Sequence, residues 1–114
     1  MEKYERLFSP IQINSIEIKN RLSMPAMFTK FANPDGSINE RIVEYLEARA
    51  KGGVGMIVLE NTCVDWEYGR ANGNPITIHK DSYIPGLYEL VIELQKSIPP
   101  HLKDNLDRLQ QNLD

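Results

Sequence analysis

The sequence contains only one cysteine, Cys63, among its 114 residues. A single cysteine excludes a disulfide within the chain and is typical of proteins from a reducing compartment, so we expect a cytoplasmic location. Cys63 itself is open to two interpretations, a small buried hydrophobic residue or a reactive thiol, and the first is the commoner case.

Long hydrophobic runs and clusters of basic residues are also missing. No apolar run approaches the roughly 20 residues that a membrane-spanning helix needs, and the charged residues that follow Met1 are not those of a signal peptide. The formal net charge is −3. No basic patch stands out, so we expect neither a membrane nor a nucleic acid as a partner.

Residue combinations that bind metals or form nucleophiles are sparse. His79 and His101 lie far apart, with no cysteine or acid at the spacing of zinc ligands, so no metal site is predicted. No histidine pairs with a serine or cysteine in a recognisable nucleophile set, and no catalytic residue is assigned. The glycines of Gly52–Gly55 precede a strand pattern, which favours a helix stop over a phosphate loop.

The composition is that of a packed globular protein, with 41% hydrophobic and 25% charged residues in a length suited to one domain. Two apolar segments, residues 21–27 and 56–59, have the pattern of strands in a parallel sheet. Between them, Ser37 and Glu40 form a capping box, which predicts a helix that has Ser37 as its N-cap and ends near Lys51. Strand, helix and strand in this order make a βαβ unit, so the fold class is α/β.

Further elements are expected on both sides of this unit. Residues 11–18 alternate apolar and polar side chains about Asn14-Ser15, which predicts a β-hairpin. Residues 61–80 are expected to form a loop, and a second helix should run from about Ser82 to Lys96 with Pro85 in its first turn. The side chains expected on buried faces are Ile11, Ile13, Ile16 and Ile18 of the hairpin, Ile42, Leu46 and Ala50 of the first helix, and Leu87, Leu90, Val91 and Leu94 of the second.

The last residues carry a separate pattern. Ser97–Pro100 should break the second helix, and a short amphipathic helix is expected to follow. This helix would pack either on its own domain or against a second copy of the chain. Its leucines are Leu102, Leu106, Leu109 and Leu113.

Ligands of parallel α/β folds bind at the carboxyl ends of the strands, which points to residues 25–28 and 60–62. An aromatic ring system could lie against Ala26 and Met27, with backbone groups bonding to its edge and Asn61 or Thr62 supplying a polar contact. The alternative is that these residues only pack the top of the sheet.

Three other side chains near these segments have two interpretations each. Glu60 could be a general base or the acceptor of structural hydrogen bonds, and the second is the commoner role. Trp66 and Tyr68 could equally form a substrate wall or pack within the long loop.

A series of short motifs runs through the chain: Leu7–Ile11, Ile18–Arg21, Met24–Met27, Tyr45–Gly55, Val58–Glu60, Gly69-Arg70 and Ile84–Leu87. In this order they resemble the N-terminal part of the Old Yellow Enzyme family of FMN-dependent NAD(P)H:flavin oxidoreductases. The resemblance implies a (β/α)8 TIM barrel, closed at its bottom by the hairpin, with FMN at its top and NAD(P)H as reductant. The substrate it implies is a small electron-poor alkene.

The same resemblance implies which residues of this chain bind the cofactor. The segment Pro25, Ala26 and Met27 would line the flavin, and Asn61 would touch its ring. Two positions differ from the family pattern. Phe28 stands where a threonine, cysteine or histidine often tunes the flavin, and Asn61 stands where a small residue is frequent.

The resemblance divides the chain into residues 1–96, a partial FMN-binding TIM-barrel domain, and residues 97–114, a helical tail unrelated to the family. The expected fold is therefore the hairpin and the first two βα units of an incomplete barrel. By lineage the chain would be an ene-reductase, and we expect it to be inactive as this truncated chain. It would bind either FMN or no cofactor. The alternative is a non-catalytic relative that acts by self-association, as a homo-oligomer, or by binding a partner.

Overall fold

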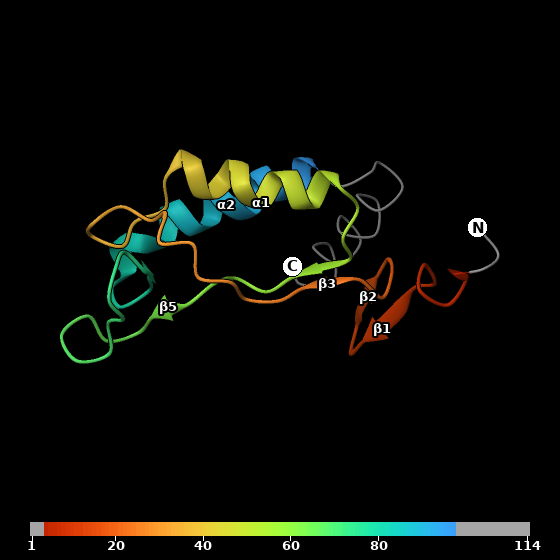
Figure 1. Ribbon diagram of the computed structural model, residues 1–114, viewed down its shortest axis with the longest axis horizontal. Helices are drawn as coiled ribbons and strands as arrows, with labels where there is room; N and C mark the ends of the chain where they lie inside the picture. Colours follow the sequence, from red (N-terminus) through yellow and green to blue (C-terminus); the bar gives the residue numbers. More distant parts are fainter. Residues whose placement is uncertain (1–3, 98–114) are drawn as a thin grey trace.

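The computed structural model describes residues 4–97, so the predicted tail helix lies outside the described residues. Helix α1 (Glu40–Lys51) and helix α2 (Ile84–Lys96) lie side by side over one face of a thin layer of short strands (Figure 1). A β-hairpin stands at one end of this layer, and a long loop lies at the other. The arrangement is α/β, and the sheets described in residues 4–97 are two-stranded and do not close into a barrel.

The N-terminal hairpin pairs β1 (Ile11–Ile13) with β2 (Ile16–Ile18) in antiparallel register. Asn14 has a φ of 54°, the left-handed conformation that asparagine tolerates and that the two-residue turn requires. The predicted hairpin is confirmed. The predicted buried face is wrong, because Ile13 and Ile16 are 51% and 48% exposed at the turn end of the hairpin, which projects from the sheet layer (Figure 1).

The first parallel pair joins β3 (Ser23–Met24) to β4 (Met56–Ile57), with Met24 opposite Ile57. One further ladder bond runs from the Val58 amide to the Met24 carbonyl, at 3.0 Å. Pro25 ends the pairing as predicted, because proline has no N–H to donate. Both strands are shorter than the predicted segments 21–27 and 56–59.

The predicted loop over residues 61–80 contains a second parallel pair, so that prediction is wrong. Strand β5 (Thr62–Cys63) pairs with β6 (Ile76–Thr77), and a long connection lies between them. Ile76 is fully buried and Thr77 is 1% exposed. Contacts across such a long connection leave no local pattern in the sequence.

Helix α1 is capped by Asn39 and not by the predicted Ser37. The Asn39 Oδ1 accepts the Ile42 amide at 3.2 Å, while the Ser37 hydroxyl donates to Asp35 Oδ1 at 2.6 Å. The Ser37 amide donates to the same Oδ1, and these two hydrogen bonds lower the pKa of the Asp35 carboxyl below its usual value of 3.8. Their stabilising effect is therefore present above that value and is lost as the pH falls through the lowered pKa.

The core lies between the helices and the strands. The predicted stripe of Ile42, Leu46 and Ala50 is buried, and Leu90 of α2 packs against it. Leu87 and Leu94 are partly buried as expected. Val91 is 50% exposed, so its predicted burial is wrong. The clustered core residues are Met24, Ala32, Ile42, Leu46, Ile76 and Leu90.

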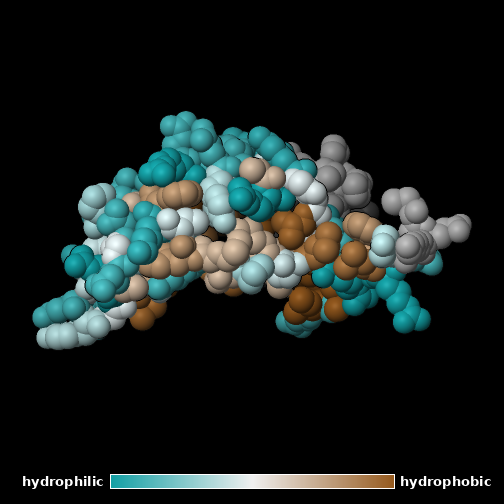
Figure 2. Space-filling view, viewed as in Figure 1, coloured by the Kyte–Doolittle hydropathy of each residue, from teal (hydrophilic) through white to brown (hydrophobic). Residues whose placement is uncertain are grey.

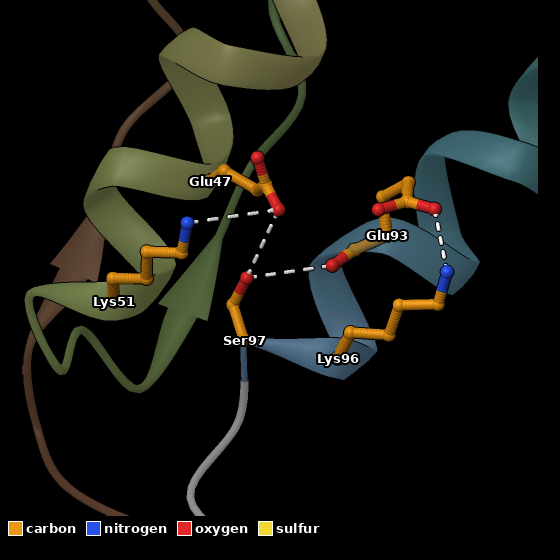
Figure 3. A network of polar contacts seen from close by, with 5 residues as sticks. All are labelled: Glu47, Lys51, Glu93, Lys96 and Ser97. Atoms are coloured by element: carbon orange, nitrogen blue, oxygen red, sulfur yellow. Dashed lines mark hydrogen bonds and ion pairs between the residues drawn. The ribbon is translucent and has the colours of Figure 1, made fainter.

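Polar contacts join the last turns of the two helices (Figure 3). The Ser97 hydroxyl lies 3.5 Å from Glu47 Oε1 and 3.4 Å from the Glu93 carbonyl. Lys51 and Lys96 pair with the two glutamates at 3.9 Å and 2.8 Å. The hydrogen bond from Lys96 to Glu93 raises the pKa of its ammonium. Exposed pairs of this kind add little stability, so apolar packing determines how the helices lie.

The observed cap gives a test of the helix start. We expect Asn39→Ala to lower the free energy of unfolding by about 1 kcal/mol, because it removes the acceptor of the Ile42 amide. Glu40→Ala is the control, since the capping box requires Glu40 and the observed cap does not. Urea unfolding followed by circular dichroism measures both, and a larger loss in Glu40→Ala would contradict this cap.

Candidate functional site

Two chain segments leave the carboxyl ends of β3 and β4 and run side by side toward β5 (Figure 1). The predicted residues Pro25, Ala26 and Met27 lie on the first segment, and Asn61 lies on the second. The structure therefore brings the two predicted parts of the site onto the same edge of the sheet, where parallel α/β folds place their ligands.

Glu60 ties these segments together. Its side chain is buried, and Oε1 accepts the Thr29 hydroxyl at 2.8 Å while Oε2 accepts the Thr29 amide at 3.1 Å. The Thr29 hydroxyl oxygen in turn accepts the Phe31 amide at 3.2 Å. A buried carboxylate needs such donors, so the structural role of Glu60 is confirmed.

The segment from Pro25 to Met27 is exposed, and Met27 is 48% accessible. Within residues 4–97, the amides of Ala26, Met27 and Phe28 donate to no protein acceptor. These N–H groups are available to a ligand, next to apolar side chains. The Thr62 hydroxyl is occupied by the Glu60 carbonyl at 2.7 Å, so Asn61 is the more available of the two predicted polar contacts.

Hydrophobic side chains gather on the same part of the molecule. The view in Figure 2 shows a brown area over the region of β2, β3 and β4. Large apolar residues exposed on these strands and their flanks are Ile16, Leu22, Met56 and Val58, at 37–48%. The site edge is therefore continuous with uncovered apolar surface.

The long loop packs around an aromatic stack. The Trp66 ring lies 5.4 Å from the His79 ring, and His79 lies 5.1 Å from Tyr83. The Arg70 guanidinium lies 4.8 Å from the Trp66 centroid. Trp66 thus packs within the loop, whereas Tyr68 is 83% exposed. Sequence analysis missed His79, which carries no local signal for this stack.

Other predicted features can be placed as well. Cys63 is 2% exposed, which confirms its interpretation as a small buried residue. Among residues 4–97, no three histidine, cysteine or acidic side chains group as metal ligands. The helices in this part of the chain are too short and polar to cross a bilayer.

Comparison with known proteins gives consistent matches. Residues 6–98 match the model of the NADH:flavin oxidoreductase / NADH oxidase family. The chain is 42% identical over 90 residues to an NADH oxidase of Thermoanaerobacter brockii, which covers 79% of this chain and 14% of that protein.

Solved structures match in the same region. A 2-naphthoyl-CoA reductase superposes with a TM-score of 0.78 at 30% identity, over 82% of this chain and 14% of that one. An Old Yellow Enzyme from Pichia sp. AKU4542 gives 0.73 at 27% identity, over 81% and 24%. The chain thus spans between 14% and 24% of these relatives.

The link between the segments can be tested on stability. We expect Thr29→Val to lower the free energy of unfolding by about 1–3 kcal/mol, because one donor to the buried Glu60 carboxylate is lost. Thr62→Val is the matched control, since its hydroxyl bonds to a neutral carbonyl and a smaller loss is expected. Chemical denaturation of both variants measures the difference, and equal losses would argue against the link.

Proposed function

The chain belongs to the NADH:flavin oxidoreductase / NADH oxidase family, and we propose that it lines the FMN ring of an NAD(P)H-dependent ene-reductase. FMN and NAD(P)H are the cofactors that this family implies. The observation that carries the proposal is the segment 25–28, at the carboxyl end of a parallel strand. Its residues 25–27 are exposed and apolar, and the amides of residues 26–28 have no acceptor within residues 4–97. Residues 1–96 are proposed as the family domain.

The residues present fit the flavin ring. An isoalloxazine has a flat apolar face and a polar edge that accepts and donates hydrogen bonds, and this segment offers a matching surface. Pro25, Ala26 and Met27 would hold the face and edge, and the Asn61 amide would add a polar contact. When bound, FMN would supply hydride transfer from NAD(P)H to an electron-poor alkene, while the protein orients and shields the ring.

Phe28 affects how the ring is tuned. Its side chain carries no hydrogen-bond donor, and its ring faces the Lys30 ammonium at 6.0 Å. Phe28 would therefore give the flavin no side-chain hydrogen bond from this position. Because the chain spans 14% of its NADH oxidase relative, we propose flavin contact for this chain and no turnover by it alone.

Flavin binding gives a direct test. We expect FMN added to the purified chain to show a shifted visible absorbance band, and Met27→Glu to weaken binding by about tenfold, since a charge replaces an apolar contact. Val91→Glu on α2 is the control, because Val91 is 50% exposed, close to the 48% of Met27. An unshifted spectrum, or equal weakening by both variants, would reject the proposed site.

A second candidate function is self-association, which the exposed apolar side chains favour. Ile13 and Ile16 at the hairpin turn, together with Met56 and Val58 near β4, leave hydrophobic area uncovered. Patches of this kind mark protein interfaces. The chain would then act as a non-catalytic relative through a second copy or a partner.

Association has its own measurement. We expect the sedimentation coefficient to rise with protein concentration, and the double variant Ile13→Lys, Ile16→Lys to reduce that rise by placing charge in the contact. The control is Tyr68→Lys, at an 83% exposed loop position. A single monomeric species at every concentration would exclude self-association.

A further inference from the structure

Helix α2 carries apolar side chains on two faces, and one of these faces is exposed. On the inner face, Leu90 is 3% exposed and packs in the core. On the other face, Ile84, Tyr88 and Val91 are 58%, 65% and 50% exposed. Residues separated by four and then three positions lie on one side of a helix. These three side chains, called here the α2 stripe, therefore form a row that is ready to pack against another helix.

The sequence after α2 contains a second apolar row with a matching spacing. Its leucines are separated by four, three and four positions, at Leu102, Leu106, Leu109 and Leu113. The α2 stripe, extended by one turn, has the same separations, at Ile84, Tyr88, Val91 and Gln95. In two consecutive antiparallel helices, residues equally distant from the connecting turn lie side by side. The pairs predicted for a turn centred on Ile98-Pro99 are Gln95 with Leu102, Val91 with Leu106, Tyr88 with Leu109, and Ile84 with Leu113.

The residues between the two rows suit such a turn. Helix α2 ends at Lys96, and Ser97 is its C-cap. Two prolines follow at 99 and 100, and proline cannot continue a helix because it has no N–H and its ring clashes with the preceding turn. Residues 97–101 make a connection within the length that joins two antiparallel helices, about 2–5 residues. The sequence therefore permits a direct reversal of the chain after α2.

We propose that residues 102–113 fold back as a helix that lies antiparallel to α2 and covers the α2 stripe of the same chain. The side chains between its leucines are polar, so this helix has a single apolar face to bury. A helix of this length is marginal by itself in water. The short connection holds it near α2 at an effective concentration of about millimolar or more, which favours its own chain over a second copy.

Disulfide formation in the full 114-residue chain tests the register. The variant Tyr88→Cys, Leu109→Cys places two thiols at a predicted pair. The control Tyr88→Cys, Leu102→Cys displaces one thiol by about 10 Å along the helix, which is beyond the reach of a disulfide. The control closes the shorter loop, so without a fixed register it would oxidise at least as fast. Cys63 is kept in both variants, since it is 2% exposed.

We expect the predicted pair to form its disulfide within one chain about tenfold faster than the control pair. Mass spectrometry of unreduced peptides measures both rates. Equal rates, or a faster control, would overturn the proposal. A disulfide that joins two chains in the predicted pair would also overturn it, because the occupant of the α2 stripe would then be a second copy.

A second measurement leaves α2 unchanged. Tetranitromethane nitrates exposed tyrosines, and Tyr68, which is 83% exposed in the long loop, is the internal reference. We expect Tyr88 to react several times more slowly than Tyr68 in the parent chain. Leu106→Asp with Leu109→Asp should bring the two rates close together, because charge in an apolar contact opposes packing.

The matched control for this measurement is Gln110→Asp with Gln111→Asp. It adds the same charge to the same segment but leaves the leucines in place, so Tyr88 should remain slow. Tyr88 that reacts as fast as Tyr68 in the parent chain would overturn the proposal, and so would equal effects of the two double variants. Slow nitration of Tyr88 that is lost only with the leucines would support it.

Discussion

The shortness of the β3–β4 ladder is the constraint on which the site depends. With two residues on each strand, backbone bonds alone cannot fix how the segments beyond them lie. Side chains hold both ends instead. Before the ladder, the Asn20 amide donates to the Gly53 carbonyl at 2.7 Å, and its Oδ1 accepts the Leu22 amide at 3.0 Å. Beyond it, Glu60 receives both donors of Thr29.

Glycine at position 55 belongs to the same arrangement. A Cβ there would lie 2.8 Å from the Asn20 carbonyl oxygen, so the two chains approach closely only because Gly55 has no side chain. The hydrogen bonds of Asn20 and those of Glu60 therefore hold the same pair of strands, one at each end. The amides of residues 26–28 lie on the segment that ends at Thr29. Because Thr29 is bound to Glu60, the position of these amides depends on the Glu60 carboxylate.

The parts of the fold that sequence predicts well have local causes. Asn14 marks the hairpin, Pro25 ends its strand, and Gly53, with a φ of +99°, follows the first helix. The errors have both local and non-local causes. Ser37 does not cap the helix, because its hydroxyl oxygen accepts the Asn33 side-chain amide at 2.9 Å, while Asn39 Oδ1 accepts the Ile42 amide.

The site shows the same division. The location of the candidate site is a prediction from the strand pattern and the family resemblance, because both place ligands at the carboxyl ends of the strands. The left-handed backbone of Lys30, with a φ of 63°, has no signal in the sequence. Neither does the pairing of β5 with β6, which closes a long connection.

The uncovered apolar surface links the two candidate functions. Parallel strands are normally covered on both faces, and here the helices cover one face while Met56 and Val58 stay 37% and 44% exposed. The family relationship accounts for this, because its larger members carry the rest of the structure outside the region matched by this chain. Whatever covers that surface would lie next to the segment proposed to line the flavin, so the two proposed functions involve the same edge of the molecule.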